Sequence, residues 1–372
     1  NQFGLPVVEW TDGSETKAPQ PSFDKIALKT YLDLKSITDE QRSAIELTQK
    51  FRKTSILVGM FLEPYIEKHV GGYLHPTYNQ IIRTGRTSCS EPNFQQLDKR
   101  AKTYILPPLG RSFWSFDYSQ IEFRLLVHVT DDASAIKAYG ENPFTDFHSL
   151  VAEWCGIPRR PAKNVNFAIG YGGGEKKVVS MLSAEPVLTN SLLDSVDKMI
   201  ADGKLDIKKR DMVFRQLCQK KGKEVYDTYH RTFPGIRIMT RKAEMLTKKR
   251  GYVKNGYGRR RHLPRRMAYK GLNSSVQGWA MDIMKDRMTA ISPRFNPKAK
   301  ELGIRIHAVV HDELLMSVPT NDEQNPVVIK FVQDTLESPS VKLKIPIRTV
   351  GGFSSLNWRE ADSELHPLQR VQ

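Results

Sequence analysis

The chain has 372 residues, with 57 Lys and Arg against 41 Asp and Glu, so its formal net charge is +16 and its pI is near 9.6. This length excludes a small scaffold held together by disulfides or metals and indicates one protein of two or three subdomains. Cys89, Cys155 and Cys218 lie too far apart for metal-ligand spacing, and their odd number gives no disulfide framework. With no apolar run long enough to span a bilayer and no signal peptide, the sequence predicts a reducing compartment and no membrane partner.

The first hundred residues predict a loop, then helices, then extended chain. Residues 1–22 are rich in Pro, Gly, Ser and Thr and predict a loop. Residues 23–70 repeat apolar side chains at three- and four-residue steps, as amphipathic helices do, and two glycines follow them. Residues 73–82 predict an extended segment, and residues 83–99 predict a polar loop.

Two strand patterns far apart in the chain each lead into an acid. An aromatic strand is predicted at residues 113–116, directly before Asp117 and a helix over residues 120–129. A β-hairpin is predicted at residues 304–318, with Asp312 in its turn. The residues between 131 and 250 predict mostly helix, and this order of elements indicates an α+β fold whose antiparallel sheet carries the acids.

Asp117 and Asp312 are candidate metal ligands. A carboxylate where a buried strand ends is costly unless something positive binds it. If the two strands are neighbours, the acids form an oxygen-rich site suited to Mg²⁺. Two such ions can activate an attacking oxygen and stabilise a leaving one, which is the chemistry of nucleotidyl transfer.

Glu122 has two interpretations at this point. Ser119 and Glu122 have the S-x-x-E spacing of a capping box at the start of the predicted helix. Glu122 could equally face the sugar of a nucleotide, and the motif favours the two interpretations about evenly.

A basic helix is predicted to begin near Pro158 and Pro161, because proline is tolerated in the first turn, and to end at the glycines 172–174. Side chains at four-residue steps share one face of this helix: Arg159, Lys163, Phe167 and Tyr171. The positive helix end and its cations would favour a triphosphate, with the two aromatic rings placed to stack on sugar and base. Taken alone, an amphipathic surface helix remains the simpler interpretation.

Residues 241–270 form a basic block in which twelve Lys or Arg stand against Glu244 alone. Such a block is typical of a surface that binds a phosphate backbone. Apolar and aromatic residues interleave with the charges, which predicts a folded basic face rather than a solvated tail. Charge alone does not distinguish nucleic acid from an acidic membrane.

Together these motifs resemble the polymerase domain of family A DNA polymerases, the DNA polymerase I type that includes phage and plasmid members. Residues 117–122 (DYSQIE) look like motif A, residues 159–172 look like motif B, and residues 310–313 (VHDE) look like motif C. Residues 84–96 and 273–278 are similar to two further family segments, and all five follow the family order.

The resemblance implies an α+β right-hand polymerase fold with an antiparallel-sheet palm, helical fingers and a partial helical thumb. The thumb would occupy residues 1–80, and the palm would occupy residues 81–132 and 266–372. The fingers would occupy residues 133–265, with an insertion at about 184–222 that the usual family member lacks. The chain is expected to carry no proofreading exonuclease.

The implied activity is template-directed addition of dNTPs to a primer 3′-hydroxyl by a two-metal mechanism. Asp117 and Asp312 would bind two Mg²⁺ ions, for which Mn²⁺ is expected to substitute, and Glu313 would be a nearby catalytic acid. Arg159 and Lys163 would hold the triphosphate, with Lys163 also protonating the leaving pyrophosphate.

The family motifs also imply contacts to the nucleotide and to DNA. Glu122 and Tyr171 would form a steric gate against a ribose 2′-hydroxyl, while Gln120 and Phe167 complete the nucleotide site. The predicted contacts to primer-template DNA, mostly in the minor groove, are Arg86, Asn273, Gln277 and His311.

The expected partners are primer-template DNA and dNTPs. The expected state is a monomer in the cytoplasm of a bacterial or phage-infected cell, with accessory replication proteins as candidate partners. Two alternatives are a single-subunit RNA polymerase and a non-catalytic nucleic-acid-binding protein on a polymerase scaffold. Glu122 and Glu313 argue against the first alternative, and the intact Asp117, Lys163 and Asp312 argue against the second.

Overall fold

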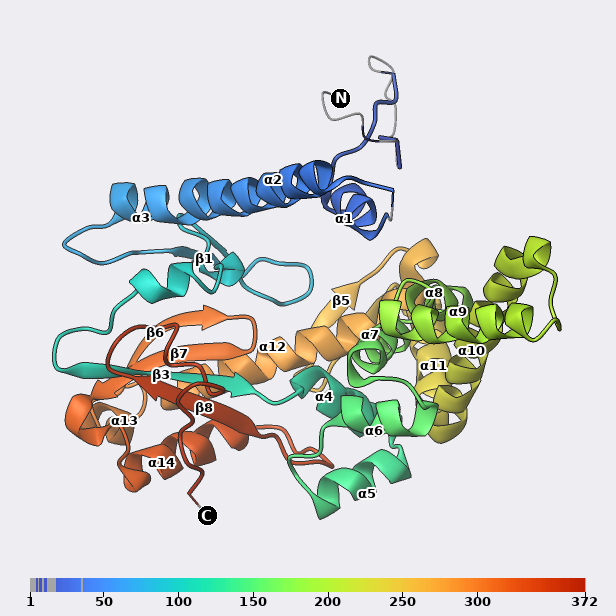
Figure 1. Cartoon of the computed structure of the whole chain (residues 1–372). Helices are drawn as coiled ribbons and strands as arrows, with labels where there is room; N and C mark the ends of the chain where they lie inside the picture. The colour runs from blue at the N-terminus through green and yellow to red at the C-terminus, as the bar shows by residue number, and fades with distance from the viewer. Residues whose placement is uncertain (1–4, 6, 9, 12–17, 35, 372) are drawn as a thin grey trace. The chain divides into compact units, whose positions relative to one another are not determined.

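The computed structural model describes residues 5, 7–8, 10–11, 18–34 and 36–371 (Figure 1). The chain divides into two compact units: residues 1–77 with 89–105, and residues 78–88 with 106–372. The loop predicted at residues 1–22 falls largely on residues outside the described set.

The first unit is helical where the periodicity predicts helix. Its helices are α1 (Lys25–Asp33), α2 (Asp39–Leu57), the π-helical turn η1 (Val58–Leu62) and α3 (Glu63–Lys68). Each of the first two begins at a side-chain cap. Asp24 accepts bonds from the first turn of α1, and Thr38 forms a capping box with Gln41 at α2.

The segment between residues 73 and 105 has little regular structure. The predicted extended stretch contains only the short strand β1 (Thr77–Asn79). The expected polar loop holds the strand β2 (Ser88–Ser90) and the 3₁₀ turn η2 (Phe94–Gln96), and a second turn, η3 (Ala101–Tyr104), follows.

The second unit contains a four-stranded antiparallel sheet in the order β6-β7-β3-β8 (Figure 1). Its strands are β3 (Arg111–Tyr118), β6 (Arg305–Val310), β7 (Glu313–Pro319) and β8 (Thr349–Ser354). Phe113, Trp114 and Phe116 of β3 are all buried, so this strand is covered on both faces and lies in the core of the unit. The predicted α+β class, with an antiparallel sheet that carries the acids, is confirmed.

The hairpin β6–β7 turns at residues 311 and 312, as predicted. His311 takes a positive φ of 57° there, a conformation that few residues other than glycine adopt. This conformation allows a two-residue turn although the sequence has no Asn-Gly or Asp-Gly signal.

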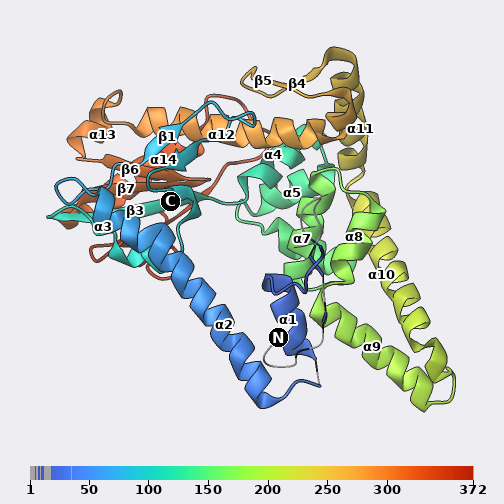
Figure 2. The same cartoon turned by 90° about the horizontal axis from the view of Figure 1, so that it is seen from above.

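Helices surround the sheet and extend away from it (Figures 1 and 2). They are α4 (Ile121–Thr130), α5 (Ala133–Glu141), α6 (Phe147–Cys155), α7 (Arg159–Gly170), α8 (Glu175–Leu182), α9 (Pro186–Ala201), α10 (Arg210–Thr232), α11 (Pro234–Arg250), α12 (Gly271–Ile291), α13 (Pro297–Glu301) and α14 (Pro326–Glu337). In both views α12 runs from the sheet to the helices around α4 and α11. The prediction of mostly helix for residues 131–250 is confirmed.

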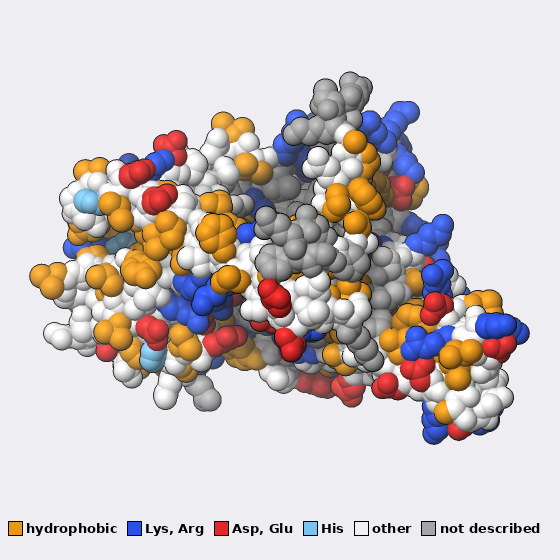
Figure 3. Space-filling view, turned by 45° about the horizontal axis from the view of Figure 1, so that its top comes forward, with side chains coloured by type: hydrophobic (Ala, Val, Ile, Leu, Met, Phe, Trp, Pro, Cys, Tyr) orange, Lys and Arg blue, Asp and Glu red, His pale blue; other side chains and the backbone are white. Residues whose placement is uncertain are grey.

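The segment predicted as an insertion, residues 184–222, is helical and consists of α9, the turn η4 (Ile207–Lys209) and the first half of α10. Ile207 and Met212 of this segment are exposed. The arm at the lower right of Figure 3 carries hydrophobic side chains beside basic and acidic ones. That this arm is an insertion remains a prediction.

The basic block is folded, as expected from its interleaved apolar residues. It comprises the end of α11, the hairpin β4 (Tyr252–Lys254) and β5 (Arg260–His262), and the turn η5 (Arg265–Lys270). Val253 and Leu263 are buried and anchor the hairpin, and the Arg260 guanidinium lies over the Tyr252 ring. The three cysteines are buried and free, and none of the described helices has the length and apolar character required to cross a bilayer.

Candidate active site

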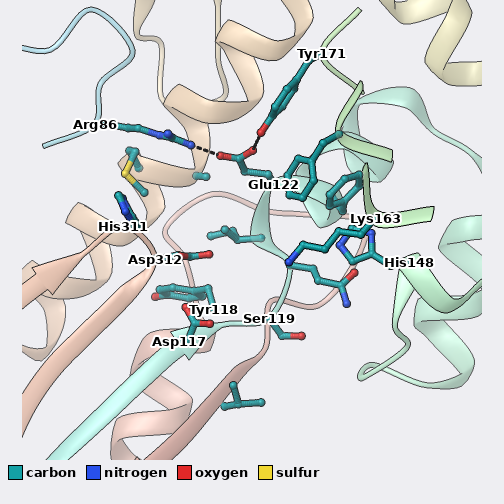
Figure 4. Close-up of a pocket in the computed structure, with 17 residues that line it drawn as sticks. Arg86, Asp117, Tyr118, Ser119, Glu122, His148, Lys163, Tyr171, His311 and Asp312 are labelled. Carbon is teal, nitrogen blue, oxygen red and sulfur yellow. Dashed lines mark hydrogen bonds and ion pairs between the residues drawn. The ribbon is translucent and has the colours of Figure 1, made fainter. Parts of the chain in front are cut away.

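A cavity of about 520 Å³ lies where β3, α4, α7 and the β6–β7 turn meet (Figure 4). Residues from segments that are distant in the sequence line this cavity. Nine of the thirteen predicted site residues line it: Arg86, Asp117, Gln120, Glu122, Lys163, Phe167, Tyr171, His311 and Asp312.

Asp117 reaches this cavity from the end of β3, and Asp312 reaches it from the turn between β6 and the neighbouring strand β7. Asp117 is the penultimate residue of β3 and is paired in register with Glu313, the first residue of β7. The backbone nitrogen of Tyr118 donates to the carbonyl oxygen of Asp312 over 3.2 Å, which ties the end of β3 to the hairpin turn. Figure 4 shows the two acids at the same end of the cavity.

The environment of Asp312 favours a bound cation. Burial raises the pKa of Asp312, and the negative charge of Glu122 raises it further against the opposing effects of the turn backbone, His311 and Arg86. A divalent cation would relieve both the desolvation of the carboxylate and its repulsion from Glu122.

The donor set fits magnesium rather than a metal held by a dedicated protein cage. Within the described residues, no three His, Cys, Asp or Glu side chains gather as a metal cluster. Two carboxylates would leave coordination positions for water and for phosphate oxygens, as is usual for Mg²⁺ at phosphoryl-transfer sites.

Glu122 connects three parts of the site. Its Oε1 accepts a bond from the Arg86 guanidinium at 2.7 Å, and its Oε2 accepts a bond from the Tyr171 hydroxyl at 2.7 Å (Figure 4). Burial and the adjacent Glu122 carboxylate raise the pKa of Tyr171, so the phenol remains a donor.

The capping-box interpretation of Ser119 and Glu122 is wrong. The residue before α4 is Gln120, in a left-handed conformation with φ 52°, and no side chain caps the helix. The Ser119 amide instead donates to the carbonyl oxygen of Arg348 at 2.9 Å. The turn is therefore one residue longer than the S-x-x-E motif requires, and Glu122 is available for long-range partners.

Helix α7 presents Lys163 and Phe167 to the cavity, and Tyr171 at its C-terminal end also lines it. It begins after Pro158 and ends at Gly170, as predicted. Gly172 follows with φ +81°, and a Cβ there would lie 3.0 Å from the carbonyl oxygen of Tyr269. Only glycine fits this position, and it lets the helix end where Tyr171 meets Glu122.

Arg159 does not line the cavity. Its Nε donates to Oδ2 of Asp146 at 2.5 Å, and the Gln120 amide donates to Oδ1 of the same carboxylate at 2.8 Å. Burial would raise the pKa of Asp146, but the bonds from Arg159 and Ser149 overcome this effect and hold it at about 2. Asp146 therefore carries its charge at neutral pH.

Three further predicted residues lie outside the main cavity. Glu313 does not line it, and its Oε1 accepts bonds from Ser115 and Trp358, each at 2.7 Å. Asn273 lines a small adjacent cavity with Glu122 and Tyr171. Gln277 is hydrogen-bonded to the Tyr171 side chain.

Sequence reasoning missed two residues that shape the site. His148 lines the cavity with its Nδ1 2.9 Å from the Asn166 amide nitrogen, and burial lowers its pKa to about 4, so the ring is neutral at pH 7. Arg124 is fully buried and donates to the carbonyl oxygens of Ser119, Pro143 and Pro346 at 2.6–2.7 Å. The one available signal for Arg124 was its place between the apolar residues Phe123 and Leu125 in the helix sequence IEFRLLVHVT.

The family model for DNA polymerase family A matches residues 14–196 and 212–360. The chain belongs to this family. The resemblance stated from the motifs is therefore confirmed, and the unmatched residues 197–211 lie within the helical arm.

Curated relatives of this family A chain come from phage and bacteria. A DNA polymerase DpoZ of Salmonella phage PMBT28 is 29% identical over 93% of this chain and 56% of the relative. A thermostable DNA polymerase I of Thermus thermophilus is 31% identical over 78% of this chain and 33% of the relative. The chain thus spans between about a third and just over half of the length of these relatives.

Among solved structures, the chain resembles the POL domain of Pol1 from M. smegmatis, determined in complex with DNA primer-template and dNTP. The TM-score is 0.70 over 94% of this chain and 58% of that one, at 24% sequence identity. At this identity the likeness concerns the fold, and it confirms the right-hand polymerase architecture.

Proposed function

We propose that this family A chain is a template-directed DNA polymerase that adds dNTPs to a primer 3′-hydroxyl. The observation that carries the proposal is the shared cavity of Asp117 and Asp312, with Lys163 of α7 also lining it. A carboxylate pair and a cation on a helix around one cavity suit a triphosphate and its metal ions.

Asp117 and Asp312 would hold two Mg²⁺ ions, with Mn²⁺ as a substitute. When bound, these ions would activate the primer hydroxyl and stabilise the leaving oxygen. Glu313 is proposed as a supporting acid, which fits its fixed bonds to Ser115 and Trp358 better than direct contact with substrate would.

The remaining nucleotide contacts are proposed from the same cavity. Lys163 would bind the triphosphate and donate a proton to the leaving pyrophosphate. Arg159 would join it after exchanging Asp146 for phosphate oxygens. Glu122 and Tyr171 would exclude a ribose 2′-hydroxyl, and Phe167 would pack against the sugar.

The DNA contacts are proposed at the rim of the cavity and on the basic block. Arg86, Asn273, Gln277 and His311 would contact primer-template near the growing end. The residues 241–270 would bind phosphates, and binding should weaken steeply with salt because counterions are released. In this proposal the four-stranded sheet is the palm, α5–α11 form the fingers, and residues 1–80 form part of the thumb.

Extension of a labelled primer tests the proposal. The chain should extend the primer with dNTPs and Mg²⁺ or Mn²⁺, and should not extend it without metal or with rNTPs alone. Asp312→Ala should lower the rate by about 10³-fold or more and leave DNA binding intact, because several kcal/mol of transition-state stabilisation are lost.

Asp334→Asn provides a control, because this exposed acid of α14 pairs with Lys330 at 3.6 Å and does not line the cavity. Its extension rate should equal that of the wild type. Preferred use of rNTPs would indicate an RNA polymerase, and DNA binding without any extension would indicate a non-catalytic binding protein. Either result would overturn the proposed function.

A further inference from the structure

A second cavity, of about 240 Å³, lies in the same unit between α12, β6 and the segment at residues 78–87. Its apolar wall is built largely by one face of α12, because residues three and four positions apart share a face. Met281, Met284 and Met288 provide this face, and Ile306 and Val309 of β6 lie across from it.

The principal polar groups at this wall already have partners within the protein. The Tyr78 hydroxyl donates to the Val309 carbonyl oxygen at 3.1 Å and accepts from the Val309 amide at 3.2 Å, which satisfies the backbone of the edge strand β6. The Lys285 ammonium donates to the Gly85 carbonyl oxygen at 2.9 Å. These groups therefore require no ligand, and the cavity presents mainly hydrocarbon and thioether surface.

The volume of this cavity and its lining residues indicate which class of ligand fits. An apolar cavity of about 150 Å³ in a protein interior accommodates benzene, so 240 Å³ suits a bicyclic aromatic molecule. Methionine side chains adapt their shape readily and attract aromatic rings through sulfur. The side chains of Gln80 and Thr87 also line the cavity and could orient one polar edge of such a molecule.

Met281 lines both this cavity and the candidate active site. It is buried on α12, so its thioether forms part of the partition between the two. A molecule that displaces the Met281 side chain must therefore change the wall of the nucleotide cavity.

We propose that the α12–β6 cavity binds neutral bicyclic aromatic molecules and that their binding slows nucleotide addition through Met281. The binding itself is independent of the proposed polymerase function, whereas the effect on rate rests on it. The ligand site and the nucleotide site are separate, so inhibition should level off at saturating ligand and leave a finite rate.

Titration with indole, followed by NMR of the chain labelled with ¹³C at its methionine methyls, tests the binding. The signals of Met281, Met284 and Met288 should shift and saturate, with a Kd on the order of 1 mM for so small a ligand. Met245, on the exposed side of α11, provides an internal control that should not shift. Absence of saturation, or an equal shift at Met245, would overturn the site.

Two variants that fill the cavity, called filling variants, test whether indole binds there. Ala308→Leu adds side-chain volume from β6, and Met288→Trp adds it from α12. Whichever variant retains the thermal unfolding transition of the wild type should lose the indole-dependent shifts. Shifts that persist in a folded variant would place the ligand elsewhere and contradict the proposal.

Primer extension then tests the coupling. Saturating indole should lower kcat/KM for dNTP by roughly fivefold, an effect typical of coupling between separate sites. The folded filling variant should be insensitive. If indole binds by NMR but leaves kcat/KM unchanged, the coupling through Met281 is wrong. If the chain does not extend primers at all, the proposed function fails while the NMR result still decides the site.

Discussion

The Tyr171 hydroxyl donates a 2.7 Å hydrogen bond to Oε2 of Glu122, which ties the end of α7 to the first turn of α4. Arg86 binds the other oxygen of the same carboxylate. With both oxygens hydrogen-bonded, the Glu122 carboxylate is held at the wall of the cavity, as the proposed steric gate requires.

Removing this wall should relax sugar selection. Glu122→Ala is expected to raise the efficiency of rNTP relative to dNTP incorporation by about tenfold or more, because space opens for a 2′-hydroxyl. Single-nucleotide kcat/KM values for matched dNTP and rNTP pairs measure the ratio. Glu301→Ala, at an exposed acid on α13, should leave the ratio unchanged. An unaltered ratio in Glu122→Ala would show that Glu122 is not the gate.

The raised pKa of Asp312 predicts a pH dependence. Burial and the Glu122 charge favour the protonated acid, so the carboxylate forms only at a pH above the ordinary range for Asp, about 4. Extension should fall as the pH is lowered through the raised pKa of Asp312, and the midpoint of this fall should move lower as Mg²⁺ is raised, because metal and proton compete. Glu122→Gln should also move the midpoint lower. Extension rates measured across pH, each series at one fixed Mg²⁺ concentration, give this midpoint. A midpoint that responds neither to Mg²⁺ nor to Glu122→Gln would contradict the assignment of Asp312 as a metal ligand.

The Asp146–Arg159 ion pair predicts that Asp146 and the triphosphate compete for the Arg159 guanidinium. Asp146→Asn keeps a good cap for α6 but removes the charge that holds Arg159 away from the cavity. The KM for dNTP should fall by about two- to fivefold, the scale of a partly exposed ion pair. Asp146→Ala should in addition destabilise the fold by about 1 kcal/mol through the lost cap. A raised KM in Asp146→Asn would mean that Asp146 orients Arg159 toward the triphosphate.

Replacement of Arg124 should lower the stability of the fold strongly. Its buried guanidinium donates to three loop carbonyls, so Arg124→Met would leave these acceptors unpaired and lower the free energy of unfolding by roughly 3 kcal/mol or more. Arg124→Lys should lose less, because an ammonium can satisfy some of them. Urea denaturation measures both, with the exposed Arg215→Met expected within about 0.5 kcal/mol of the wild type. A urea denaturation midpoint of Arg124→Met equal to that of the wild type would contradict this account.

The sequence predicted the parts of the site that depend on local pattern. Apolar and aromatic runs identified the strands that lead to Asp117 and Asp312, and four-residue steps brought Lys163 of α7 and Tyr171 just after it onto one face. The order of the motifs along the chain, which matches the family, then predicted that motifs A and C lie together. The structure places both acids at one cavity.

The remaining features depend on partners distant in the sequence. The capping-box motif failed because Glu122 is bound by Arg86 and Tyr171, which no local spacing reveals. Likewise, the four-residue step placed Arg159 on the correct face of α7, but Asp146 holds its guanidinium away from the cavity.

The central claim is that Asp117 and Asp312 act as one metal site, and a double-mutant cycle on primer extension tests it most directly. Asp117→Asn and Asp312→Asn should each lower the single-turnover rate by about 10³-fold or more, and the double variant should be little worse than either, because the two act as a unit. DNA binding should be retained throughout. A near-wild-type rate in either single variant, or fully multiplicative losses in the double variant, would contradict the account.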